Sequence, residues 1–250
     1  MIRYSQASGI ARITLHRPEK RNALSPEMIA SLRAVLEQSA EDDAIRVVLL
    51  TAAEPDFCAG LDLSGLHASA ENVLDHIGAA RELAEIFLAI RRHPRPVVAA
   101  VRGRALGGGC GLATGSDLIV ASDSAKFGYP EVNIGFVPAM VMAILRRSVS
   151  DKRAFELLAT GEVISAAEAH AIGMINRVFP DAEFESNVEK YVANLASKSA
   201  SSLSLTKNLL YHTDGMTFEA ALEAGIHTNA LARMTEDARR GFERFTKKRE

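Results

Sequence analysis

The stretch that decides the fold is VRGRALGGGCGLATGSDL, which spans Val101–Leu118. It follows VVAAV at Val97–Val101, a continuous apolar run that predicts a strand buried on both faces. Glycine allows positive φ angles and a close approach of the backbone to a ligand. A helix that begins near Gly108 or Gly109 would offer unpaired N–H groups and the positive end of a helix dipole. The stretch therefore predicts a strand, a glycine turn and a helix whose start can face a ligand.

Two common explanations of a glycine cluster do not fit. A dinucleotide fingerprint needs G-x-G-x-x-G, and the run at Gly107–Gly111 lacks that spacing. A P-loop needs a lysine where Gly109 stands. A second loop, PDFCAGLDL at Pro55–Leu63, also follows an apolar run. N–H groups that converge from two such loops would make an oxyanion hole, although a glycine cluster alone is equally compatible with tight packing of a helix on a strand.

The rest of the chain alternates strands with helices before it becomes helical. Ser25 and Pro26 have the types expected at the cap and first position of a helix. This pattern predicts an α/β fold, with a core over residues 1–195 and a helical C-terminal region over 196–250. Strands are expected at 2–6, 10–15, 46–51, 97–101 and 117–121, and helices at 71–92, 138–147, 151–160, 165–172, 181–199, 202–212 and 217–247.

The composition is that of an ordinary globular protein. The chain has 250 residues, of which 48% are hydrophobic and 24% charged, and a formal net charge of −2. This balance argues against nucleic acid or an anionic membrane as the main partner. The beginning of the chain lacks the apolar run of a secretory signal, and the chain has no apolar run long enough to cross a bilayer. A cytoplasmic protein without membrane contact is therefore expected.

The chain also lacks the spacings of a metal site or a disulfide framework. Its seven histidines show no H-E-x-x-H pattern, so no metal is expected. The two cysteines, Cys58 and Cys110, have no evident base nearby in sequence. They are expected to be small buried residues.

Four segments, in order, resemble the crotonase (enoyl-CoA hydratase/isomerase) superfamily nearly from end to end. They are HRPEKRNALSPEM (16–28), FCAGLDL (57–63), GRALGGGCGLATGSDLIVAS (103–122) and AKFGYPEVNIGFVP (125–138). The resemblance implies a crotonase-like core, a spiral of repeated strand–strand–helix units, (ββα)n. It also implies a homotrimer or a dimer of trimers (a hexamer), with residues 196–250 as the oligomerisation region. The implied ligand is an acyl-coenzyme A thioester, and no cofactor beyond that coenzyme A is implied.

The resemblance also assigns residues by position. Leu61 and Gly108 occupy the places whose main-chain N–H groups hold the thioester oxygen, and Glu131 occupies that of a catalytic glutamate. Asp62 could instead be a helix cap. Phe245 and Lys248 lie in the segment that resembles the family's last helix, which commonly reaches a neighbouring subunit's ligand. The implied substrate-binding residues are Ala23, Leu24, Ala59, Asp62, Leu63, Gly107, Lys20, Arg21, Phe245 and Lys248.

One departure from the family pattern leaves the reaction open. Family members that hydrate crotonyl-type substrates usually carry a second glutamate, and its place here is Gly111. A hydratase of fatty acid metabolism, or of branched substrates such as methylglutaconyl-CoA, is the first interpretation. An enoyl-CoA isomerase that uses Glu131 as its only acid/base is the second. The third is a non-catalytic acyl-CoA-binding or scaffolding relative.

Overall fold

A six-stranded sheet runs through the computed structural model, which describes residues 1–65 and 72–247. The strand order is β1-β2-β3-β4-β6-β9, and every neighbouring pair is parallel except the β1–β2 hairpin. The hairpin turns at Ser8 and Gly9, both with positive φ. The strands are β1 (Ile2–Ala7), β2 (Ile10–Leu15), β3 (Val47–Ala52), β4 (Val97–Val101), β6 (Leu118–Ser122) and β9 (Arg177–Phe179).

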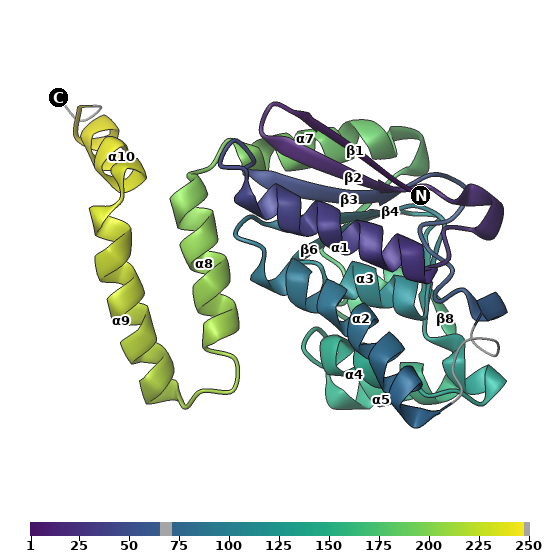
Figure 1. The fold of residues 1–250 in the computed structure, drawn as a ribbon. Helices are drawn as coiled ribbons and strands as arrows, with labels where there is room; N and C mark the ends of the chain where they lie inside the picture. The colour runs from purple at the N-terminus through teal and green to yellow at the C-terminus, as the bar shows by residue number, and fades with distance from the viewer. Residues whose placement is uncertain (66–71, 248–250) are drawn as a thin grey trace.

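The central strands are mostly apolar, and helices cover both faces of the sheet (Figure 1). Alternate residues of β3 belong to different clusters. Val48 and Leu50 pack with α1 (Pro26–Glu41) and the helices beside it. Val47 and Leu49 pack with Phe184 and its neighbours on α7 (Phe184–Ala196). Burial on two sides explains why VVLLTA has no polar alternation.

A second, three-stranded sheet supports the glycine turn, and the sequence did not predict it. Its order is β5-β7-β8, formed by β5 (Arg104–Leu106), β7 (Lys126–Gly128) and β8 (Val163–Ser165). Strands of three residues are too short to show a period in the sequence. The small sheet matters because β5 leads directly into α3 (Gly108–Gly115).

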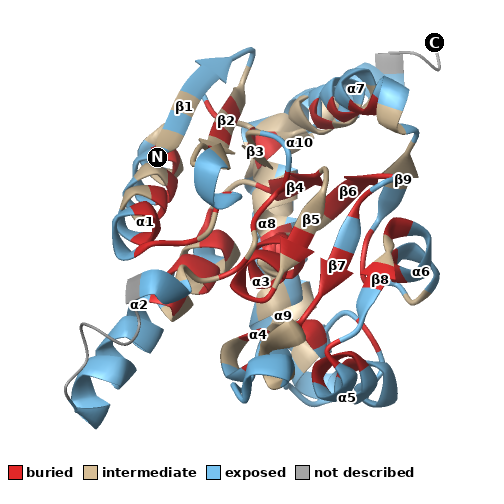
Figure 2. Cartoon of the chain, turned by 90° about the vertical axis from the view of Figure 1, so that its right-hand side faces the viewer, coloured by how far each residue is buried: buried red, intermediate tan, exposed pale blue. Residues whose placement is uncertain are grey.

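Most expected helices are confirmed, and α2 (Val73–Arg92) is one of them. Its C-terminal half packs on the core through Leu83, Phe87 and Ile90, whereas Leu74 and Ile77 are exposed. Figure 2 shows the beginning of this helix projecting from the body of the molecule. The remaining helices of the core are α4 (Ala139–Leu145), α5 (Asp151–Thr160) and α6 (Ala166–Ala171), with the short 3-10 helices η1 (Pro18–Lys20), η2 (Leu63–Gly65), η3 (Pro130–Ile134) and η4 (Asp181–Glu183).

The C-terminal region consists of α8 (Ala200–His212), α9 (Phe218–Met234) and α10 (Glu236–Lys247). The prediction of a single helix over 217–247 was wrong, because Thr235 has extended backbone angles and separates α9 from α10. Figure 1 shows α9 and α10 standing apart from the sheet. No helix within residues 1–65 and 72–247 combines the length and apolar character needed to cross a bilayer.

Buried polar groups anchor α8 to the core. The Lys207 ammonium donates to the Asp117 carboxylate at 2.7 Å and to two main-chain carbonyl oxygens near the end of α2. The Tyr211 hydroxyl donates to the other oxygen of Asp117 at 2.6 Å, and the Val97 N–H donates to Asp117 at 2.7 Å. Asp117 therefore has a structural role at the start of β6, where it joins α8 to β4.

Candidate active site

The first loop is held against the N-terminal segment by a two-residue parallel bridge. The Leu24 N–H donates to Gly60 at 2.8 Å, and its carbonyl oxygen accepts from Asp62 at 2.9 Å. Both bonds skip Leu61, because successive peptide groups of an extended chain point in opposite directions. The Leu61 N–H therefore points away from Leu24, and no acceptor for it exists in the described part of the chain.

The start of α3 lies against the loop that contains Leu61. Gly107 precedes the helix with φ 52° and ψ −124°, a conformation that favours glycine. Within residues 1–65 and 72–247 the Gly108 N–H has no acceptor, as expected for the first turn of a helix. The two loops are in contact here: a Cβ atom at Gly60 would lie 3.7 Å from the Gly108 nitrogen, and one at Gly108 would lie 3.8 Å from Leu61 Cγ.

The carboxylate of Glu131 lies against the same glycine turn. Glu131 is in η3, which follows β7. A Cβ atom at Gly107 would lie only 3.0 Å from its Oε1, so the turn admits the carboxylate because residue 107 has no side chain. The Oε2 atom is buried and has no hydrogen-bond partner among the described residues. Burial raises the pKa of Glu131, an effect partly offset by its own backbone N–H.

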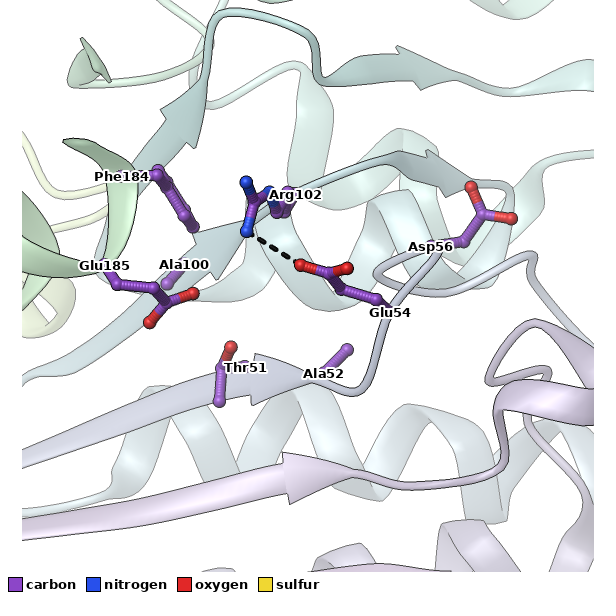
Figure 3. Close-up of a pocket in the computed structure, with 8 residues that line it drawn as sticks. All are labelled: Thr51, Ala52, Glu54, Asp56, Ala100, Arg102, Phe184 and Glu185. Carbon is purple, nitrogen blue, oxygen red and sulfur yellow. Dashed lines mark hydrogen bonds and ion pairs between the residues drawn. The ribbon is translucent and has the colours of Figure 1, made fainter. Parts of the chain in front are cut away.

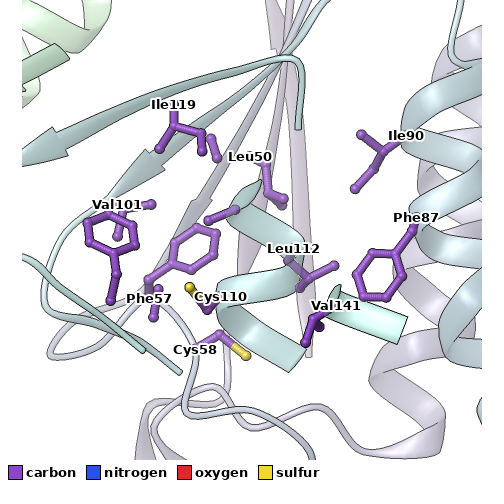
Figure 4. Close-up of a cluster of buried hydrophobic side chains, with 14 of the residues drawn as sticks. Leu50, Phe57, Cys58, Phe87, Ile90, Val101, Cys110, Leu112, Ile119 and Val141 are labelled. Atoms are coloured by element: carbon purple, nitrogen blue, oxygen red, sulfur yellow. The ribbon is translucent and has the colours of Figure 1, made fainter. Parts of the chain in front are cut away.

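Apolar side chains form the remaining surroundings of the helix start. Leu24, Leu61 and Leu83 face the position of Gly108. At Gly111, a Cβ atom would lie 2.5 Å from Val141 Cγ1 and 3.1 Å from Phe87 Cζ. Figure 4 shows Phe87 and Val141 beside Leu112 of α3. The place of the family's usual second glutamate is therefore filled by side chains from α2 and α4.

The other predicted substrate-binding residues are distributed unevenly. Leu24 is buried, Ala23 and Ala59 are half-buried, and Leu63 is 51% exposed at the start of η2. Lys20 and Arg21 are exposed in the turn that leads to Ala23. Phe245 is exposed on α10, which Figure 1 places far from α3, and Lys248 lies outside the described residues. Contact of either residue with a neighbouring subunit's ligand stays a prediction.

Asp62 forms an ion pair and also caps a short helix. Its Oδ2 accepts from Arg17 Nη1 at 2.6 Å, while its Oδ1 accepts from the Ser64 N–H at 3.1 Å. Hydrogen bonds from Ser64 and then from Arg17 hold the pKa of Asp62 well below its usual range. Capping, the alternative weighed from the sequence, is thus present, and a contact with ligand stays a prediction.

Neither thiol is placed for chemistry. Cys58 and Cys110 are fully buried, and burial raises the pKa of each to about 12. A protonated thiol is a poor nucleophile and a poor metal ligand. No group of three or more His, Cys, Asp or Glu side chains in the described ranges could hold a metal ion.

A small polar hollow near the ends of β3 and β4 is separate from this arrangement (Figure 3). Arg102 lies within it and donates to Glu54 at 2.7 Å. Leu61, Gly108 and Glu131 are not among its lining residues, which are Thr51, Ala52, Glu54, Asp56, Ala100, Arg102, Phe184 and Glu185.

Sequence reasoning missed the side chains that connect the two loops. Asp56 is 4% exposed and pairs with Arg104, 48 residues later. Asn22 is fully buried with φ 55° and donates to the carbonyl oxygens of Ala53 and Asp56. The one available signal was Asn22, because asparagine tolerates the left-handed region better than most residues.

Sequence comparisons find similar proteins over nearly the whole chain. The sequence profile of the enoyl-CoA hydratase/isomerase family matches residues 5–250. A Thermus thermophilus protein with the provisional name of enoyl-CoA hydratase is 39% identical over 241 residues, covering 96% of this chain and 95% of its own. Rat enoyl-CoA hydratase domain-containing protein 3, which is mitochondrial, is 35% identical, covering 98% of this chain and 81% of its own.

Solved structures confirm the crotonase-like core. An enoyl-CoA hydratase from Mycobacterium smegmatis superposes with a TM-score of 0.95 at 32% identity, covering 99% of this chain and 96% of its own. Human enoyl-CoA hydratase domain-containing protein 3 gives a TM-score of 0.94 at 33% identity, covering 100% and 98% of the two chains. Sequence and fold agree over nearly the whole length, and the chain therefore belongs to the enoyl-CoA hydratase/isomerase family.

Proposed function

We propose that this protein binds an acyl-CoA thioester and stabilises its enolate, with enoyl-CoA hydration as the first candidate reaction. The observation that carries the proposal is the meeting of three groups at one glycine turn. They are the N–H groups of Leu61 and Gly108, which lack acceptors within residues 1–65 and 72–247, and the Glu131 carboxylate, whose Oε2 has no hydrogen-bond partner there. Names of relatives that include enoyl-CoA hydratase support the same substrate class.

The chemistry requires little more than these groups. A thioester carbonyl oxygen gains negative charge as the α-carbon loses a proton or as water adds to the β-carbon. Two fixed N–H donors stabilise that charge, and loss of one such donor typically costs about 2.7–4 kcal/mol of transition-state stabilisation. Glu131 would exchange the proton, and its raised pKa brings it closer to neutrality, where a general acid/base works best.

Isomerisation is the second candidate, and the surroundings of Gly111 favour it. Val141 and Phe87 leave no space there for a second carboxylate. In isomerisation Glu131 would take a proton from the α-carbon of a 3-enoyl thioester and return it to the γ-carbon, so one carboxylate suffices. In hydration Glu131 would take a proton from water as the hydroxyl adds to the β-carbon, and would then deliver that proton to the α-carbon. This reaction needs another group to orient the water.

The first test measures the step that both reactions share. A saturated thioester such as butyryl-CoA, incubated with the protein in D2O, should exchange its α-protons. Glu131→Gln should abolish exchange while the thioester still binds, because glutamine cannot take up the proton. Glu162→Gln, an exposed glutamate beside β8, is the matched control and should exchange at the wild-type rate.

Product analysis then separates the candidates. Crotonyl-CoA converted to a β-hydroxyacyl product supports hydration, and a 3-enoyl-CoA converted to its 2-enoyl isomer without hydration supports isomerisation. Binding of thioesters without exchange or turnover over short, long and branched substrates would contradict the proposal and identify a non-catalytic relative.

A further inference from the structure

A forked ion pair joins the two loops that carry the candidate N–H donors. Asp56 Oδ1 accepts from the Arg104 main-chain N–H at 3.0 Å and from its Nε at 2.9 Å, and Oδ2 accepts from Nη2 at 2.8 Å. Asp56 is 4% exposed, so the pair is partly shielded from water. Two parallel N–H···O bonds fix orientation as well as distance.

The pair is close to both donors along the chain. Leu61 follows Asp56 by five residues, and Gly108 follows Arg104 by four. Between the pair and the donors, the Cys58 N–H donates to the Arg104 carbonyl at 3.0 Å, while the Cys58 carbonyl accepts from Leu106 at 2.9 Å. The two segments therefore run side by side from the ion pair towards the donors, and a shift of one along the other would break the fork.

Asp56 also connects to the segment that orients Leu61 from the other side. Its main-chain carbonyl accepts from Asn22 Nδ2 at 2.7 Å. Two residues after Asn22, Leu24 forms the bridge that directs the Leu61 N–H away from itself. Asp56 thus contacts the N-terminal segment through its main-chain carbonyl and β5 through its side chain, and it precedes Leu61 in its own loop.

We propose that Asp56 and Arg104 are positioning residues that fix the Leu61 N–H relative to the Gly108 N–H. This inference rests on the proposed function, because it needs a thioester oxygen held between the two groups. Neither side chain would touch the substrate. Their effect is geometric, and a displacement of about 1 Å at reacting groups can cost roughly 100-fold in rate.

The test uses Asp56→Asn and Arg104→Lys, with Glu54→Gln as the control. Asparagine places an NH2 group against the guanidinium but keeps the acceptor for the Arg104 N–H. Lysine keeps a charge and the main-chain bond but loses the fork. The Glu54–Arg102 pair also joins the 52–57 and 101–104 segments (Figure 3), but Glu54 is largely exposed, and its loss should leave activity unchanged.

The informative measurement is the infrared carbonyl stretch of a bound thioester labelled with 13C at the carbonyl. Two donors lower this frequency in the wild type, and Asp56→Asn should return it towards the value of the free thioester. The α-proton exchange rate should fall by about 10- to 100-fold in Asp56→Asn and less in Arg104→Lys, with KM changed less than about threefold, because the carbonyl contacts weaken while coenzyme A contacts remain.

The outcomes distinguish this inference from the proposed function. A wild-type protein that binds thioesters without lowering the carbonyl frequency would refute both. A lowered frequency in the wild type that persists in Asp56→Asn and Arg104→Lys, with exchange intact, would refute only the positioning role. An equal loss in Glu54→Gln would also refute it. If Asp56→Asn does not fold, Arg104→Lys alone decides, since it retains a positive charge and the main-chain bond.

Discussion

Gly111→Ala should destabilise the protein through a collision with one identified side chain. The new Cβ atom would lie 2.5 Å from Val141 Cγ1 and 3.1 Å from Phe87 Cζ, so α4 must move or Val141 must leave its rotamer. Overpacking of this kind costs about 1–3 kcal/mol. Alanine in place of a helical glycine returns about 1 kcal/mol. The net expected loss in the free energy of unfolding is therefore about 0–2 kcal/mol.

The magnitude alone does not identify the mechanism, but its coupling to Val141 does. Val141→Ala removes two buried methyl groups and should cost about 1–3 kcal/mol. In the double variant the methyl group introduced at position 111 occupies space that the Val141 side chain has left. The double variant should therefore be more stable than the sum of the single effects predicts, by about 1–2 kcal/mol.

Urea unfolding of the four proteins measures this coupling. The unfolding midpoints and slopes give the free energies, and an unchanged slope shows that the same cooperative unit unfolds. Additivity within about 0.5 kcal/mol would refute the packing explanation, as would a Gly111→Ala variant more stable than the wild type. Gly111→Glu should be strongly destabilised and should not gain hydratase activity, because Val141 and Phe87 occupy the space that the new carboxylate would need.

Three further predictions concern buried ionisable groups. The raised pKa of Glu131 means that the folded state holds this proton more tightly than the unfolded state, so stability is lost as pH rises through that pKa. Urea unfolding should therefore show Glu131→Gln gaining stability relative to the wild type as pH rises. A pH-independent difference between the two proteins would contradict the raised pKa. Burial lowers the pKa of His93 from 6.5 to about 4, so about 3 kcal/mol of stability is lost as pH falls through this range. In urea unfolding, His93→Gln should lose less stability than the wild type between these pH values. The same loss in both proteins would contradict a lowered pKa of His93. Lys207→Met removes the counter-ion of the buried Asp117 carboxylate and should cost about 3–5 kcal/mol in urea unfolding. Lys207→Met/Asp117→Asn should recover most of that loss if the uncompensated charge is the cause.

Features specified by neighbouring residues could be predicted from the sequence. Ser25 caps α1 because its hydroxyl accepts from the N–H three residues later. The run at Val97–Val101 is a strand buried on both sides, and α3 begins at Gly108. The glycine turn could be located in advance because its conformation demands glycine at Gly107.

Features that depend on distant partners could not be predicted. Asp56 and Arg104 are ordinary charged residues in the sequence, and only the fold brings them together. The exposure of Leu74 and Ile77 is equally hidden, since their spacing is that of a core-facing helix. Thr235 looks like a residue within a helix, yet it ends one. The roles of Leu61, Gly108 and Glu131 came from a family resemblance and stay predictions until activity is measured.

The order of strands in the large sheet has a consequence for synthesis of the protein. β9, at Arg177–Phe179, pairs with β6, which ends at Ser122. A nascent chain on the ribosome therefore exposes the open edge of β6 until some 55 further residues have emerged. Unpaired strand edges recruit other chains, so fragments truncated before Phe179 should aggregate, whereas truncation after α7 leaves every strand with its partner.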